Sequence, residues 1–175
     1  MTAYVVDTNV LLAANGAHAD LDPKCVESCV RRLADIQKSA RVVIDDQYRI
    51  LSEYLHKTNS ATGKRPGDVF LKWLLQNQAN GRRCDQVSLT ETASEAFQEF
   101  PSKELECNFD SSDRKFVAVA NAHPDKPPIL QASDSKWLQW NAELKTLGLT
   151  VEFLCPEDIC RFFTKKFPGS PIPEF

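Results

Sequence analysis

The stretch YVVDTNVLLAANG, Tyr4–Gly16, decides the fold. It places three polar side chains, Asp7, Thr8 and Asn9, between two apolar runs. The first run is short and rich in β-branched residues, which is typical of a strand buried in a sheet. The sequence therefore predicts a buried strand that delivers Asp7 to its end, a polar turn that steadies it, and a helix that returns to the core.

The same alternation of strand-like and helix-like segments continues along the chain. Short runs rich in Val, Ile and Leu predict buried strands at Ala3–Val6, Arg41–Ile44, Asp85–Leu89, Pro128–Gln131 and Leu149–Leu154. Apolar residues every three or four positions predict helices at Val26–Ile36, Tyr48–Leu55, Val69–Leu75, Phe116–Ala122, Trp137–Leu147 and Ile159–Phe163. Strands joined through helices imply right-handed crossovers. We therefore predict an α/β fold, a three-layer α/β/α sandwich around a central, mostly parallel five-stranded sheet.

Length and composition predict one domain, because 175 residues with 42% hydrophobic side chains can build one sizeable core. We place this domain at residues 1–164. The Pro-rich tail, 165–175, is expected to be disordered or to lie across the surface. The segments Lys57–Gly67 and Pro101–Asp110 are expected to be exposed connections. No apolar run approaches the ~18 residues of a membrane span, so we expect a cytoplasmic protein without a membrane partner.

The six cysteines form no CxxC pair and keep no zinc-finger spacing from the three histidines. Cys25 and Cys29 are one helical turn apart and could share a ligand or a face. No second pair of ligands is visible near them in the sequence. We therefore expect free, buried thiols in a reducing compartment.

Acidic residues end the predicted strands or open the helix that FDSSDRKFVAVA begins: Asp7, Asp45, Asp46, Asp110, Asp113 and Asp134. In an open parallel sheet, ligands bind beyond the carboxyl ends of the strands, so these side chains are expected at one edge. Each aspartate alone could be a helix cap, since a carboxylate accepts hydrogen bonds from free N–H groups. The net charge of −3 neither excludes nor indicates a nucleic-acid substrate.

Glu53 separates the capping interpretation from a functional one. It lies about two turns into a predicted helix, where capping cannot explain it. A glutamate at the solvent boundary, paired with Lys57, is the structural alternative. Carboxylates packed together repel and need a cation, and oxygen ligands suit Mg²⁺ or Mn²⁺. Such a site activates a water for attack on a phosphodiester.

The order of these motifs, VVDTNVLL, then EY, then DSSDRKFVAVA, then ILQASDSKW, resembles a PIN domain over nearly the whole chain. That family comprises metal-dependent nucleases with a parallel-sheet α/β/α fold. It includes VapC-type toxins, which cleave RNA and are silenced by an antitoxin. Carried over by position, the resemblance implies that four acids are both catalytic residues and metal ligands: Asp7, Glu53, Asp113 and Asp134.

The resemblance also implies roles for the neighbours of these acids. Asn9 matches a small polar residue that holds the pocket in place. Beside it, Thr8 can hydrogen-bond locally, and Ser133 is adjacent to the fourth acid. From spacing rather than resemblance, Asp46 is expected to be a supporting residue, because it shares a helical stripe with Glu53. Two positions depart from the family pattern, with Ala132 before the fourth acid and Lys136 after it. These departures favour one Mg²⁺ or Mn²⁺ ion and leave a second ion open.

Basic residues beside the acids are the expected substrate contacts: Arg114, Lys115 and Lys136. Trp137 and Trp140 could stack on an unpaired base, but core packing is the stronger expectation.

Two functions from different classes stay open at this point. The first is a metal-dependent endoribonuclease that cuts single-stranded or looped RNA, in the role of the toxin of a toxin–antitoxin pair. The alternative is a catalytically silent PIN-like module that binds RNA or a protein. The expected partners are RNA, with an antitoxin protein and a second copy of the chain left open.

Overall fold

The computed structural model describes all residues from Met1 to Phe175 and contains one central five-stranded sheet. Every strand in it runs parallel to its neighbours. Their order across the sheet is β3 (Cys84–Val87), β2 (Arg41–Asp45), β1 (Ala3–Val6), β6 (Ile129–Gln131) and β7 (Val151–Phe153). The predicted strands and the predicted fold class are thus confirmed, and the main sheet is parallel throughout.

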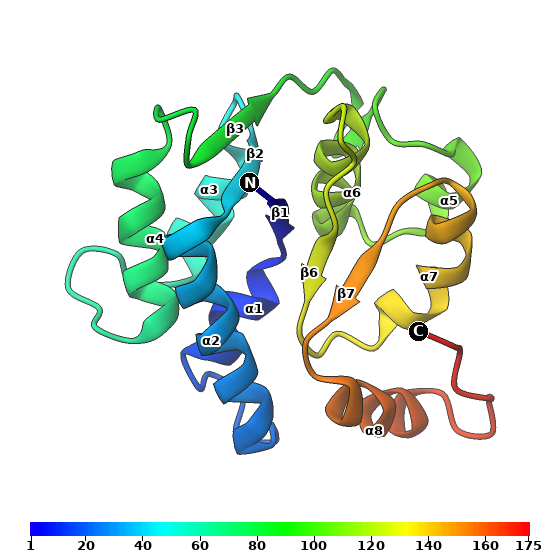
Figure 1. Ribbon diagram of the computed structural model, residues 1–175. Coiled ribbons are helices and arrows are strands. Elements are labelled where there is room, and N and C mark those ends of the chain that lie inside the picture. Colours follow the sequence, from blue (N-terminus) through cyan, green and yellow to red (C-terminus); the bar gives the residue numbers. More distant parts are fainter.

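Helices cover both faces of this sheet and complete the three layers. Three of them pack against one another: α1 (Thr8–Ala14), α2 (Pro23–Ser39) and α4 (Pro66–Asn77). Helix α6 (Arg114–Ala122) packs against β1, β2 and β6, with α3 (Arg49–Lys57) beside it. In Figure 1, α2 and α4 lie on one side of the strands, and α6 lies on the other with α7 (Lys136–Thr146) and α5 (Lys103–Asn108). Helix α8 (Pro156–Lys166) follows β7.

The core fills the space between these layers. The middle strands are buried on both faces, as their continuous Val, Ile and Leu runs predict: Val5, Val6, Val42, Val43, Ile44, Ile129 and Leu130 are all 0% exposed. Trp137 and Trp140 are buried as well, and Phe109 stacks on Trp140 with ring centroids 3.7 Å apart. Core packing of both tryptophans is therefore confirmed.

The segment Pro101–Asp110 is not the exposed connection that we expected. It contains α5, whose start is capped by Ser102 through a hydrogen bond from the Leu105 N–H. Leu105 and Phe109 are buried, because the short helix turns both toward the core. A separate two-stranded antiparallel hairpin, β4 (Glu91–Ala93) and β5 (Ala96–Phe97), precedes it and was not predicted either.

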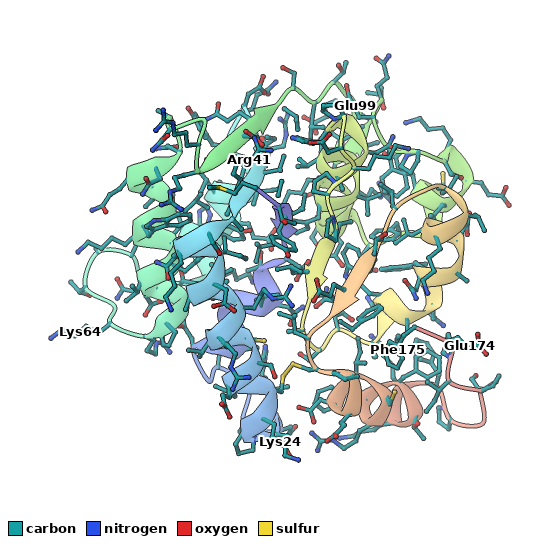
Figure 2. All side chains as sticks on the ribbon, in the orientation of Figure 1. Lys24, Arg41, Lys64, Glu99, Glu174 and Phe175 are labelled. Carbon is teal, nitrogen blue, oxygen red and sulfur yellow. A yellow bond between two sulfur atoms is a disulfide. The ribbon has the colours of Figure 1, made fainter.

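The expectation of free buried thiols is wrong for two of the cysteines. A disulfide joins Cys25 on α2 to Cys155, just before α8 (Figure 2). Cys29 and Cys84 are free and buried, and burial raises the pKa of each thiol to about 12. Sequence spacing could not reveal this pair, because its members are 130 residues apart and meet only through tertiary packing.

The C-terminal tail lies across the surface, which is one of the two expected arrangements. Helix α8 ends at Lys166, two residues beyond the predicted domain boundary. The tail then returns to α7, where the Asn141 side chain donates a hydrogen bond of 3.2 Å to the Glu174 carbonyl. The Phe175 ring contacts the Phe153 ring, and Glu174 and Phe175 are labelled in Figure 2. None of the helices combines the length and the apolar character that crossing a membrane requires.

We expect Cys155→Ser to lower the free energy of unfolding by about 2–4 kcal/mol, because the cross-link restricts the unfolded chain; Cys155 is replaced rather than Cys25 because the Cys29 sulfur lies 3.8 Å from that of Cys155. Urea unfolding without reductant measures this loss, and a phosphine reductant should bring wild type down to the variant. Cys107→Ser, at an exposed free thiol, is the matched control and should leave stability unchanged. Equal stability of wild type and Cys155→Ser in air would show that no disulfide forms.

Candidate functional site

Asp7 is placed at the carboxyl edge of the sheet by backbone pairing. Its N–H donates a 3.0 Å hydrogen bond to the Leu130 carbonyl, so the pairing of β1 with β6 extends to this residue. One carboxylate oxygen, Oδ1, accepts a 2.8 Å hydrogen bond from the Asn9 N–H and caps α1. The side chain is only 3% exposed. Asp7 is thus a helix cap and a member of the acidic site at once, because capping occupies only one of its two oxygens.

Glu53 reaches the same edge from α3. Its Oε1 accepts a 2.5 Å hydrogen bond from the Thr8 hydroxyl, 45 residues away. The next residue, Tyr54, is fully buried and donates its hydroxyl to the Val6 carbonyl. Two hydrogen bonds therefore attach α3 to the end of β1. Thr8, for which we expected a local hydrogen bond, holds the Glu53 carboxylate in position.

Asp113 and Asp134 complete the acidic site. Asp113 ends the 3₁₀ turn η1 (Ser111–Asp113) directly before α6, and Asp134 follows β6. Burial, followed by the negative charges of Asp113, Glu53 and Asp134, raises the pKa of Asp7 well above its ordinary value. Burial and the charges of Asp134 and Asp110 raise the pKa of Asp113 to about 7. The structure thus brings together the four acids that the sequence singled out.

The three expected substrate cations are all engaged within the protein. Lys115 is buried, forms an ion pair with Glu53 and donates to the Ser112 carbonyl. Its positive charge partly opposes the rise in the pKa of Asp113. Lys136 forms an ion pair with Asp110, and this hydrogen bond raises the pKa of Lys136.

Arg114, the third of these cations, donates to the backbone carbonyls of Phe109 and Glu95, at 3.2 and 3.4 Å. Its guanidinium therefore fastens the hairpin and the end of α5 to the start of α6.

The remaining supporting residues take different positions. Ser133 and Asn9 line a cavity of about 320 Å³ together with Asp134. Asp46 accepts a hydrogen bond from the Ser88 hydroxyl at 2.5 Å, and it precedes α3, which begins at Arg49. Asp46 therefore does not share a helical stripe with Glu53, as the sequence suggested, because the helix starts three residues later.

Asp45 and Asp110, two further aspartates that could have been helix caps, have different roles. Asp45 is fully buried and accepts hydrogen bonds from the N–H groups of Arg49 and Ile50, so it is a structural cap of α3. Asp110 makes no capping bond, and its carboxylate pairs with Lys136 instead.

Three of the four acids, Asp7, Asp113 and Asp134, keep oxygens that could bind a cation, whereas both oxygens of Glu53 are engaged, one by the Thr8 hydroxyl and one by Lys115. Asp7 and Asp134 each use one oxygen for a backbone N–H, while Asp113 accepts only a long 3.4 Å bond from the Ser112 hydroxyl. Each aspartate therefore has an oxygen free for a ligand. No three of these acids bring ligand atoms within 4.8 Å of one another; the cysteines Cys25, Cys29 and Cys155 do, but Cys25 and Cys155 are joined in the disulfide. The acids are therefore more widely spaced than that, and a cation among them would be held by one or two carboxylates and by water.

Two cavities include members of the acidic site in their lining. The smaller cavity lies beside Asp134, and a larger one of about 490 Å³ is lined by Glu53 and Lys115. The larger cavity is also lined by Tyr48 and by Glu95 of the hairpin, which sequence reasoning missed. The unpredicted hairpin forms part of its wall, so no local pattern could have revealed it.

Comparison of the chain with protein-family models, with curated proteins and with solved structures gives no match. A function must therefore be inferred from the geometry of the site.

We expect Asp113→Asn to stabilise the metal-free protein by about 1–3 kcal/mol at pH 8, because it removes one of several repelling buried charges. The folded-state pKa is about 7 against an ordinary 3.8, so the folded protein binds the proton more tightly than the unfolded chain. Wild type therefore gains stability as pH falls from about 7 to about 4. The variant should lack that gain, and urea unfolding at pH 5 and pH 8 with a chelator measures the difference.

Asp45→Asn is the matched control for this measurement. The Asp45 carboxylate accepts two backbone N–H groups and caps a helix, so its neutralisation should destabilise the protein by about 1–2 kcal/mol. If Asp113→Asn destabilised the protein as much as Asp45→Asn at pH 8, the acidic site would not be under electrostatic repulsion.

Proposed function

We propose that this chain is a PIN-like, metal-dependent endoribonuclease that hydrolyses phosphodiester bonds of single-stranded or looped RNA with Mg²⁺ or Mn²⁺. The supporting observation is the set of four carboxylates that β1, α3, η1 and β6 bring to one edge. Burial and mutual repulsion raise the pKa of Asp7 and Asp113, so the arrangement costs stability that an ordinary fold would avoid. Such a cost is typical of a functional site.

Some of these residues would hold the cation, and others orient the acids. The free oxygens of Asp7, Asp113 and Asp134 would hold the ion, and Thr8 keeps the Glu53 carboxylate facing it. When bound, the ion supplies an activated water and stabilises charge on the transferring phosphoryl group. The cavity beside Glu53 and the cavity beside Asp134 would each accept part of the strand, which suits cutting within a chain. An unpaired strand is preferred because its backbone can bend into the hollows.

One observation favours the alternative of a catalytically silent module. The ammonium group of Lys115 pairs with Glu53, and a protein cation at this place can substitute for part of the metal's charge. A silent module would then bind RNA or a protein partner through the same cavities. Metal binding by wild type separates the two functions.

The proposed nuclease is tested by cutting of labelled single-stranded RNA with Mn²⁺, with Mg²⁺ or with EDTA. We expect EDTA to abolish cutting and Asp7→Asn to lower its rate by at least ~100-fold, because even residues that merely support metal ligands cost 10–100-fold. Asp22→Asn is the control, since Asp22 only caps α2 by accepting the Lys24 N–H and should leave cutting unchanged. Cutting that persists in EDTA and in Asp7→Asn would refute the proposal.

Lys115→Met tests the alternative by calorimetric titration with Mn²⁺. For a nuclease we expect wild type to bind Mn²⁺, and the variant to bind it roughly two- to tenfold more tightly after loss of a nearby like charge. Binding of Mn²⁺ by the variant alone would instead favour the silent module.

A further inference from the structure

The larger of the two cavities has features that metal binding does not explain. It lies between the start of α3, the β4–β5 hairpin and the start of α6, and we call it the α3–hairpin cavity. Its volume is about 490 Å³, and its lining includes Tyr48, Glu53, His56, Glu91, Glu95 and Lys115. Because Glu53 and Lys115 also belong to the acidic site, the cavity opens directly beside the acids.

Tyr48 is held in a strained conformation at the wall of this cavity. Its backbone is left-handed, with φ 60° and ψ 27°, which is rare for a bulky residue. Asp45 imposes this geometry, since its carbonyl accepts the Tyr48 N–H and its carboxylate accepts the next two N–H groups, of Arg49 and Ile50. Tyr48 is nevertheless 47% exposed. Backbone strain with little burial in return indicates a residue kept for binding.

A second strained residue lines the same cavity. Glu95, in the turn of the hairpin, has φ 53°, and only one other residue besides it, Tyr48 and the glycines has a positive φ, Lys126. The Glu95 backbone is held at both ends, because its N–H donates to the Glu91 carboxylate and its carbonyl accepts from Arg114. The Glu95 carboxylate itself is exposed and makes no hydrogen bond or ion pair within the protein.

The charges around the cavity favour a neutral ligand over a phosphate. Arg49 donates to Glu91 at 2.9 Å, and Lys115 pairs with Glu53, so both cations are neutralised by partners in the lining. Glu95 is left as an unpaired acceptor. A ligand with a flat ring and an N–H donor matches an exposed aromatic ring and a free carboxylate.

We propose that the α3–hairpin cavity binds one nucleobase of the RNA strand, stacked on Tyr48 and hydrogen-bonded through its amino group to Glu95. This inference rests on the proposed RNA substrate and names how the strand beside the acids is recognised. Cytosine is then preferred over uracil, because its exocyclic amino group donates where uracil presents a carbonyl oxygen.

The first test is binding of fluorescein-labelled hexacytidylate and hexauridylate, measured by anisotropy in EDTA so that no cutting occurs. Stacking contributes about 1–3 kcal/mol per base, so Tyr48→Ala should weaken binding of hexacytidylate by roughly 5- to 150-fold. Tyr48→Phe keeps the ring and should stay within about twofold of wild type. Unchanged affinity in Tyr48→Ala would overturn the proposal.

Tyr48→Gly separates a binding role from a structural one. Glycine relieves the left-handed strain, so the melting temperature should rise by about 2–4 °C while RNA affinity falls as in Tyr48→Ala. A residue needed for stability would show the reverse, with a lower melting temperature and unchanged affinity.

Glu95→Ala tests the amino-group contact. Wild type should bind hexacytidylate more tightly than hexauridylate, and the variant should bind both alike. Glu104→Ala, at an exposed glutamate on α5, is the matched control and should keep the cytosine preference. A preference that survives in Glu95→Ala, or no preference in wild type, would remove Glu95 from the site.

The outcomes distinguish this inference from the proposed nuclease activity. Affinity that depends on Tyr48 in a protein that cuts no RNA would support the base site and refute the nuclease. If the protein cuts RNA with metal but its RNA affinity does not change when Tyr48 or Glu95 is replaced, the nuclease is supported and the base site is refuted. RNA that is neither bound nor cut would refute both.

Discussion

The repulsion among carboxylates at the carboxyl edge of the sheet is the constraint on which the rest of the site depends. Asp7 sits at the end of the central strand, nearly without solvent, with three further acids close enough to raise its pKa. Negative charges in such a place are unfavourable unless cations or hydrogen bonds compensate them. Each hydrogen bond or ion pair around the edge either lowers this electrostatic cost or holds an acid in position despite the repulsion.

Compensation comes from three kinds of contact. Backbone N–H groups of Asn9 and Lys136 bind one oxygen each of Asp7 and Asp134. The Thr8 hydroxyl binds Glu53, and the ammonium of Lys115 adds a positive charge beside it. These contacts leave Asp113 with almost no hydrogen-bonding partner, and its pKa of about 7 shows that compensation by the protein is incomplete.

The parts of the fold that depend on local pattern could be predicted from the sequence. The five strands and six helices follow from runs and periods within single segments, and the edge position of Asp7, Asp113 and Asp134 follows from parallel topology. Contacts between distant segments were beyond prediction. Lys115 was expected to contact the substrate, but packing pairs it with Glu53. The segment that forms α5 was expected to be an exposed connection, but Leu105 and Phe109 are buried in the core. Nothing in the sequence around Cys25 indicates that it forms a disulfide with Cys155.

The stretch YVVDTNVLLAANG by itself determined a buried strand, an acid at its end and a helix after it, because strand and cap preferences act over a few residues. Only the tertiary structure decided what surrounds that acid: Glu53 held by Thr8, a lysine among the carboxylates, and a hairpin that encloses a cavity beside them. The physical reason is that the two kinds of interaction act over different separations along the chain. Hydrogen bonds along the chain are set by neighbours in sequence, whereas burial and charge repulsion depend on every segment that packs within a few ångströms.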